Sequence, residues 1–319
     1  MIEAQQLTKR YGEKTAVDGL DFTVRPGSVT GFLGPNGAGK STTMRMIVGL
    51  DAPTTGSVTV NGRRYAEHTS PLQEVGALLE ARSIHPGRSA FDHLMAQAHT
   101  HGIPRRRVDE VIGLTGLQSV AKKRAGAFSL GMGQRLGIAA ALLGDPATVM
   151  LDEPVNGLDP EGVLWIRNLL TTLAAEGRTV FVSSHLMSEV ALVADHLIVV
   201  GRGRLLADTT VSELVRRAGG DTVKVASADP ARLREVLSAP GVEITGRAGS
   251  EELEVAGLSA REIGLAAAAH GIALFELTAR AVSLEEAFME LTRDAVEYHG
   301  TTGTTGTIGT GTDTPGRVA

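Results

Sequence analysis

The feature that most constrains the fold of this chain is the segment Gly34-Pro35-Asn36-Gly37-Ala38-Gly39-Lys40-Ser41, which fits the pattern G-x-x-x-x-G-K-[ST]. An apolar run at residues 28–33 precedes it and indicates a buried strand, and residues 42–48 indicate a helix. In such a strand-to-helix turn, glycines let several backbone N–H groups point at one anion. Lys40 adds a positive charge for the β- and γ-phosphates, and the Ser41 hydroxyl is placed to ligate Mg²⁺. The segment therefore predicts a phosphate-binding loop, against the alternative of a chance glycine-rich turn.

Two further apolar runs end in polar side chains that suit phosphate chemistry. Residues 148–151 are followed by Asp152 and Glu153, and residues 179–184 are followed by His185. An Asp at the end of a buried strand beside a phosphate loop can hold the Mg²⁺ shell. We interpret Glu153 as the base for the attacking water, the alternative being a carboxylate that only begins a helix. The predicted catalytic residues are Glu153, His185 and Lys40.

Taken together, these motifs resemble the ATP-binding cassette of ABC transporters over about residues 2–215. They follow the family's order and spacing, and each has a counterpart: Gly34–Ser41 resembles the Walker A loop, Ser129–Arg135 the signature motif, Leu151–Glu153 the end of Walker B, Asn156–Asp159 the D-loop, and His185 the switch histidine. The resemblance implies an α/β P-loop NTPase fold. Its parts are a RecA-like parallel core, an antiparallel β-subdomain and a helical subdomain.

The same resemblance implies the site residues beyond the catalytic three. ATP would be bound by Tyr11, stacked on adenine, and by Gly34, Pro35, Asn36, Gly37, Ala38, Gly39, Lys40, Ser41 and Thr42. Mg²⁺ would be held by Ser41, Asp152 and Glu80. A homodimer would bury ATP between the phosphate loop of one subunit and the signature motif of the other, with Ser129, Gly131, Gln134 and Asp159 at the interface.

Two departures from the usual family pattern are visible. Glu80 stands where most cassettes have Gln, and a similar Glu occurs in lantibiotic-immunity and bacitracin-type exporters. In the signature motif, Leu130 and Met132 replace the usual residues, and the form S-L-G-M resembles the drug and bacteriocin export branch.

The order of predicted elements divides the chain. Residues 1–216 are expected to be the cassette, with a β-rich segment at 3–62 and a helical insertion at 90–143. After a linker at Ala218–Gly220, residues 221–296 read βαββαβ and then α, which suggests a small ferredoxin-like α+β domain. Its closing helix contains Ser283–Phe288, and we expect an interaction role for the domain. Residues 300–319 are rich in Thr and Gly and are expected to be disordered.

Composition excludes several classes of protein. The chain has 319 residues, a net charge of −5 and no cysteine, which rules out a disulfide scaffold and gives no sign of a nucleic-acid-binding face. No apolar run approaches the roughly 20 residues that cross a bilayer. Two basic runs, residues 105–107 and 122–124, are interpreted as solvated, as are the remaining histidines, His99 and His101 among them.

We therefore expect the cytoplasmic ATPase subunit of an ABC exporter, peripheral on the inner face of the cell membrane. It resembles the drug and antibiotic-resistance branch, of daunorubicin or bacitracin type. The implied cofactors are ATP and Mg²⁺, and the implied partners are a second cassette and a separate ABC-2-type permease, with no nucleic acid. The alternatives are a soluble ABC ATPase that acts on ribosomes or DNA, and an exporter of another cargo such as an ion or a polysaccharide.

Overall fold

The computed structural model describes residues 1–80, 84–187, 190, 192–217, 222–247, 250–280 and 284–292. The predicted linker, the residue Ser283 and the predicted tail at 300–319 lie outside these ranges. No helix in the described ranges is long and apolar enough to cross a membrane.

A six-stranded sheet forms the centre of the cassette, in the order β5 (Val75–Leu78), β6 (Thr148–Asp152), β7 (Thr179–Ser184), β3 (Val29–Leu33), β8 (His196–Gly201) and β9 (Arg204–Thr210). The first five strands are parallel and β9 is antiparallel to β8. Every residue of β3 is buried, as its continuous apolar sequence predicts for a central parallel strand. The parallel core expected for a P-loop NTPase is confirmed.

A second, antiparallel sheet consists of β2 (Lys14–Val24), β1 (Ile2–Tyr11) and β4 (Thr55–Val60). Three phenylalanines join it to the core: the ring of Phe22 lies 5.9 Å from that of Phe32 and 6.0 Å from that of Phe181. Helix α1 (Lys40–Ile47) belongs to the same hydrophobic cluster. This apolar layer fixes the antiparallel sheet beside the phosphate loop.

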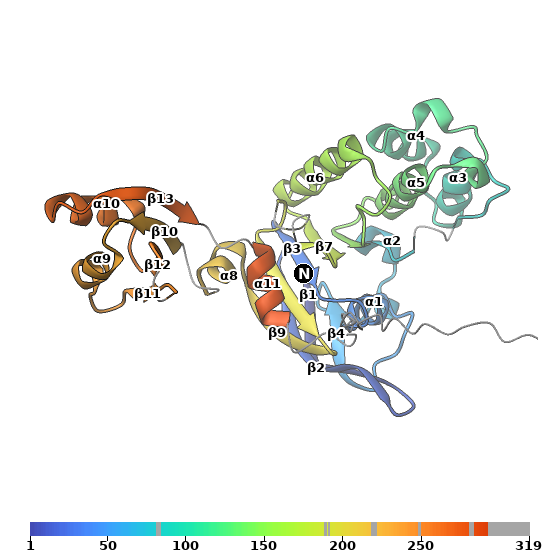
Figure 1. Ribbon diagram of the computed structural model, residues 1–319. Coiled ribbons are helices and arrows are strands. Elements are labelled where there is room, and N and C mark those ends of the chain that lie inside the picture. Colours follow the sequence, from blue (N-terminus) through green and yellow to red (C-terminus); the bar gives the residue numbers. More distant parts are fainter. Residues whose placement is uncertain are drawn as a thin grey trace, which may run out of the picture.

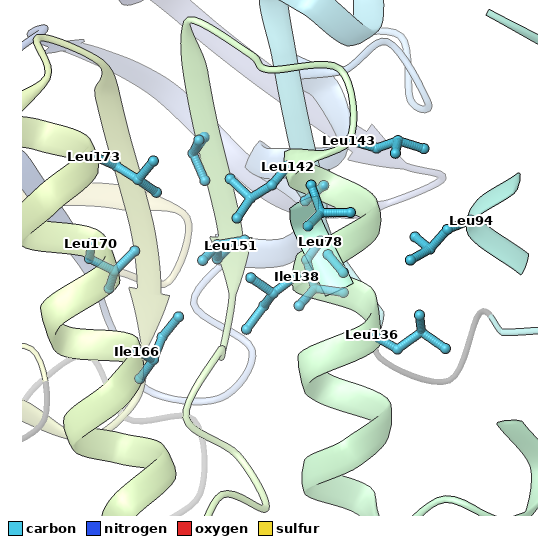
Figure 2. Close-up of a cluster of buried hydrophobic side chains, with 14 of the residues drawn as sticks. Leu78, Leu94, Leu136, Ile138, Leu142, Leu143, Leu151, Ile166, Leu170 and Leu173 are labelled. Atoms are coloured by element: carbon cyan, nitrogen blue, oxygen red, sulfur yellow. The ribbon is translucent and has the colours of Figure 1, made fainter. Parts of the chain in front are cut away.

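The helical part contains α3 (Ala90–Thr100), α4 (Arg105–Leu114) and α5 (Leu130–Leu142), and α6 (Pro160–Ala175) follows β6 (Figure 1). Helix α5 packs directly on β5, because a Cβ on Gly76 would lie 1.9 Å from the Ala141 oxygen. Figure 2 shows the leucine-rich cluster that α5 shares with β6 and α6. Shorter elements connect these parts: η1 (Tyr65–Glu67), α2 (Pro71–Glu74), η2 (Gln118–Val120), η3 (Ala125–Ala127) and α8 (Val211–Arg217).

Two residues of the basic run at the start of α4 are paired along their own helix. Arg105 lies 3.9 Å from Asp109, and Arg106 lies 2.8 Å from Glu110. Such exposed pairs are weak because water and salt screen them. Arg105 and Arg106 fit a solvated helix start, but Arg107 does not: its side chain is 20% exposed, donates to the Leu142 oxygen and pairs with Asp145 at 3.1 Å.

The C-terminal unit contains β10 (Thr222–Ser227), α9 (Pro230–Leu237), β11 (Glu243–Thr245), β12 (Glu252–Ala256), α10 (Ala260–Ala269) and β13 (Leu274–Arg280). Its antiparallel strands lie in the order β11-β12-β10-β13 and enclose their own hydrophobic cluster with the two helices. This order is that of a ferredoxin-like sandwich. The predicted capping box is present, since Ser259 and Glu262 exchange hydrogen bonds at the start of α10.

The last helix, α11 (Leu284–Thr292), differs from the prediction for residues 221–296. It packs beside α8 of the cassette, as Figure 1 shows, and its Phe288 is buried in a cluster with cassette residues. The C-terminal unit is therefore inserted between two helices of the cassette. Local sequence predicted the helix correctly but not the surface that buries it, because helix periodicity does not identify the partner.

Candidate active site

The predicted site residues meet at one edge of the parallel sheet. The phosphate loop follows β3, and His185 follows β7. Asp152 is the last residue of β6, Glu153 is the next residue in the chain, and Glu80 lies two residues after the end of β5. Parallel strands place their carboxyl ends at the same edge, which is where ligands bind in open α/β sheets. The topology thus brings together residues up to 145 positions apart in the chain, from Lys40 to His185.

The phosphate loop depends on glycine at two positions. A Cβ on Gly34 would lie 2.3 Å from the Val200 oxygen. Gly39 has a left-handed φ of 99°, and its Cβ would lie 2.5 Å from the Ala16 oxygen. Helix α1 begins at the next residue, so its unpaired N–H groups and positive dipole end open onto the loop. This geometry suits an anion.

The Lys40 side chain is folded inside the loop and is only 7% exposed. Its Nζ donates to the Gly34 oxygen at 2.6 Å and lies 3.9 Å from Oε1 of Glu153. Burial lowers the pKa of Lys40, and the charges of Glu153 and Asp152 oppose that shift. The ammonium group is thus partly removed from water, where its attraction to a phosphate is strengthened.

Ser41 and Asp152 form a cluster of oxygen donors. The Ser41 hydroxyl donates to Oδ2 of Asp152 at 2.7 Å, and the Ser183 hydroxyl donates to Oδ1. Ser41, Asp152 and Glu80 line one cavity of about 640 Å³. Hydroxyl and carboxylate oxygens suit Mg²⁺, which usually also takes ligands from phosphate and water. In the described ranges no three His, Asp or Glu side chains form a metal site by themselves, so these residues fit an ion that is bound together with a nucleotide.

Glu153 adopts an uncommon backbone conformation beside this cluster. Its φ is 50°, a left-handed value that costs a residue other than glycine about 1–3 kcal/mol. Its backbone N–H donates to the Ser183 hydroxyl at 3.0 Å, and its Oε2 lies 2.8 Å from Nδ1 of His185. The Glu153 carboxylate thus lies between Lys40 and His185.

The signature motif and the D-loop pack against each other. Ser129 caps α5 by accepting a hydrogen bond from the Met132 N–H at 3.2 Å, and Asp159 caps α6 in the same way. A Cβ on Gly131 would lie 2.8 Å from the Gly157 oxygen. Both capping residues are exposed, so the start of α5 is open to a partner.

Gln134 corrects one sequence expectation, since it was predicted at the dimer interface. Its side chain is 2% exposed, and Nε2 donates to the Glu153 oxygen at 3.2 Å within the same chain. Gln134 is the fifth residue of α5, and its side chain faces the sheet instead of the surface. Gln134 therefore links the signature helix to the backbone of Glu153.

Tyr11 lies at the end of β1 and is 49% exposed. Its hydroxyl donates to Oδ2 of Asp51 at 3.0 Å and also interacts with Thr42 at the start of α1. Nζ of Lys9 lies 5.0 Å from the ring centroid. The exposed ring therefore stands next to the phosphate loop, on the side of the antiparallel sheet.

Sequence reasoning missed His93, which it grouped with the solvated histidines. His99 and His101 are exposed, but His93 is 8% exposed and lines the same cavity as Glu80. Its Nδ1 has no hydrogen-bond partner among the described residues, and burial lowers its pKa. The helical spacing of Ala90, His93 and Leu94 places His93 on the buried face of α3, a signal that was available in the sequence.

Comparison with known proteins agrees with this geometry. The ABC transporter family profile matches residues 17–156, and a domain family of unknown function, DUF8746, matches residues 221–285. The bacitracin transport ATP-binding protein BcrA of Bacillus licheniformis is 41% identical over 68% of this chain and 72% of its own length. The linearmycin resistance ATP-binding protein LnrL of Bacillus subtilis is 33% identical over 92% of this chain and 98% of its own.

Among solved structures, one described as an ATP-binding subunit of an ABC transporter is 27% identical. Its TM-score is 0.63, and the match covers 69% of this chain and 93% of the chain in that structure. A second structure, that of CbiO1 from Clostridium perfringens, is 26% identical with a TM-score of 0.58. The match covers 68% of this chain and 94% of the CbiO1 chain. Sequence, fold and site geometry agree, and this chain belongs to the ATP-binding subunits of ABC transporters.

Proposed function

We propose that this chain hydrolyses ATP at the carboxyl edge of its parallel sheet and thereby drives export through a separate membrane permease. The observation that carries the proposal is the position of the Glu153 carboxylate, 2.8 Å from Nδ1 of His185 and 3.9 Å from Nζ of Lys40. A carboxylate that can act as a base thus lies within contact distance of both a histidine and a phosphate-binding ammonium group. Phosphoryl transfer needs mainly such positioning and charge stabilisation.

Each side chain has a role in this reaction. The loop N–H groups and Lys40 bind the phosphates, and Ser41, Asp152 and Glu80 would hold Mg²⁺, which when bound neutralises charge on the β- and γ-phosphates. Glu153 orients a water molecule and accepts its proton as the water oxygen bonds to the γ-phosphorus. The bond from that phosphorus to the β–γ bridging oxygen breaks, which leaves ADP and phosphate. His185 orients Glu153 and contacts the γ-phosphate.

A second copy of the chain completes each site in this proposal. Ser129 and Asp159 are exposed at the starts of α5 and α6, where N–H groups and the helix dipole attract an anion. In a two-fold dimer, the same surface of each subunit would close over the other subunit's phosphate loop. Gln134 is left out of this interface because it is buried.

The cargo and the permease are proposed from the relatives. Those named for bacitracin, lantibiotic and linearmycin transport or resistance are 33–41% identical to this chain. This similarity supports an amphipathic antibiotic as cargo, an ABC-2-type permease, and a place on the cytoplasmic face of the membrane. It favours export over action on ribosomes or DNA. We also propose that residues 222–280 form an interaction domain that docks the permease or the second subunit.

The experiment combines the purified chain with cells. The chain should hydrolyse ATP in the presence of Mg²⁺, and Glu153→Gln should abolish turnover while ATP binding persists. Cells that express the chain together with its cognate permease should resist bacitracin, and cells with Glu153→Gln should not. Equal resistance of both strains would refute ATP-driven export of this cargo. Hydrolysis without any resistance would preserve the ATPase but reject the cargo.

A further inference from the structure

Helix α11 completes a hydrophobic cluster beneath the catalytic edge, which we call the α11 cluster. Its buried members come from β3, β8, α8, α11 and the segment after His185: Leu33, Met187, Val190, Ala194, Leu197, Val199, Leu214 and Phe288. Leu33 directly precedes the phosphate loop, and Met187 lies two residues beyond His185. The cluster is therefore continuous with both segments that we place at the γ-phosphate.

Val190 and Ala194 are packed closely against β3. A Cβ on Gly31 would lie 2.2 Å from Cγ1 of Val190 and 3.4 Å from the Cβ of Ala194. These two residues therefore have no space to move toward the sheet. Leu214 of α8 and Phe288 of α11 belong to the same cluster.

Phe288 is the main contribution of α11 to this cluster. It is 8% exposed, whereas the next residue, Met289, is 68% exposed on the other side of the helix. Leu291 packs against the cluster from the same face as Phe288. The Thr292 hydroxyl donates to the Phe288 oxygen at 2.7 Å and closes the last turn of α11. Among the described side chains of α11, Phe288 and Leu291 thus connect the helix to the cassette.

The C-terminal unit is joined to the cassette through this cluster on both sides. Residues 222–280 lie in the chain between α8, which contributes Leu214, and α11, which contributes Phe288. The family profile for the C-terminal unit ends at residue 285, near the start of α11. Figure 1 shows α8 and α11 beside each other, between the cassette sheet and that unit. The C-terminal unit thus lies in the chain between the two helices that contribute Leu214 and Phe288 to the α11 cluster.

We propose that Phe288 is a positioning residue for His185, and that the C-terminal unit modulates ATP turnover by moving α11. Phe288 is a buried member of the cluster that contains Met187 and Val190. His185 lies two residues before Met187, and its Nδ1 is 2.8 Å from Oε2 of Glu153. The inference rests on the roles proposed above for Glu153 and His185. It adds a coupling between the C-terminal unit and the chemical step.

The test compares Phe288→Ala with the matched control Met289→Ala in the full chain. Phe288→Ala should lower kcat about three- to thirty-fold, the size of effect seen when residues between coupled sites are changed, and leave KM for ATP unchanged. Phe288→Leu should restore most of the turnover, and Met289→Ala should behave as the wild type. In a His185→Ala background, Phe288→Ala should cause no further loss, because both changes remove the same contribution.

Three results would overturn the inference. The first is a wild-type kcat for Phe288→Ala, and the second is a rise in KM for ATP as large as the fall in kcat. The third is a fall in kcat in the His185→Ala background as large as the fall that Phe288→Ala causes in the wild-type chain. Thermal melts establish that each variant is folded at the assay temperature. If Phe288→Ala is unfolded, Leu291→Ala is tested in both backgrounds by the same criteria, because Leu291 packs against the same cluster. Glu153→Gln in the same assay separates the two proposals. If it retains turnover, the proposed site fails; if it is inactive while Phe288 has no effect through His185, only this inference fails.

Discussion

Replacement of Glu153 by Gln tests the chemistry most directly, because the two side chains have the same shape. The amide can keep the contact with His185, which is 2.8 Å long in the wild-type chain. The backbone strain at φ 50° is also unchanged. The substitution therefore removes a negative charge and a proton acceptor while it leaves the local structure in place.

The expected loss can be given a magnitude. A positioned general base contributes about 10²–10⁴ in rate, so kcat should fall by that factor, equivalent to about 3–5 kcal/mol in the activation free energy. ATP affinity should be unchanged or higher, because the variant loses a negative charge 3.9 Å from the Lys40 ammonium. At that distance a unit charge interacts with the lysine by about 1 kcal/mol in water and more in a partly buried site.

The assay is steady-state phosphate release together with equilibrium binding of a fluorescent ATP analogue. Glu176→Gln is a matched control, because Glu176 is a surface residue paired with Arg178 at the other end of the sheet. The control should keep wild-type turnover. Wild-type turnover in Glu153→Gln would refute the assignment of the base. A more than tenfold loss of binding would show that Glu153 acts on affinity and not on the chemical step.

Three further predictions concern the loop and its surroundings. Gly39→Ala should abolish ATP binding and lower the melting temperature, because its Cβ would meet the Ala16 oxygen; Gly177→Ala, with a φ of 88° and no neighbour within 4 Å, should retain binding. Lys40→Met should also lose ATP binding but melt no lower without nucleotide. Burial holds the pKa of Lys40 below its ordinary value of 10.5, so at pH values below the folded pKa the charged lysine lowers the stability of the folded protein. The gain in stability from Lys40→Met should therefore disappear as the pH rises toward 10.5, where the lysine is neutral in the folded protein. Glu80→Gln should preserve ATP affinity and alter the Mg²⁺ dependence of turnover, and an unaltered Mg²⁺ titration would exclude Glu80 as a ligand.

The positions of the central site residues could be predicted from the sequence because the signals are local. Gly34 and Gly39 are needed within one turn, and Asp152 and Glu153 follow directly on a buried strand. Once a parallel sheet is inferred from alternating strands and helices, the carboxyl ends of its strands must meet at one edge. The fold of the C-terminal unit could be predicted for a similar reason, since the order of its elements restricts the possible sheets.

The failures share a different physical cause. Gln134 belongs to a helix start that was predicted to face a partner, but its position around the helix axis directs its side chain toward the sheet. His93 was expected to be solvated because it is not part of a metal-ligand pattern, although its spacing along α3 places it on the buried face. In both cases the position around the helix axis decides burial, and residue type does not. Periodicity counted from the observed start of each helix would have corrected both interpretations.

The position of α11 could not be read in this way, because its apolar face is equally compatible with the C-terminal sheet and with the cassette. The sheet of the C-terminal unit already buries its apolar face under α9 and α10. Leu265, Phe275 and Leu277 of the unit are nevertheless exposed, so its surface alone does not exclude a further helix. Phe288 of α11 is instead buried in the cassette cluster that contains Leu214. The choice of surface is therefore a property of the tertiary fit between α11 and the cassette, and it places the chain's last described helix in contact with the cluster beneath the catalytic edge.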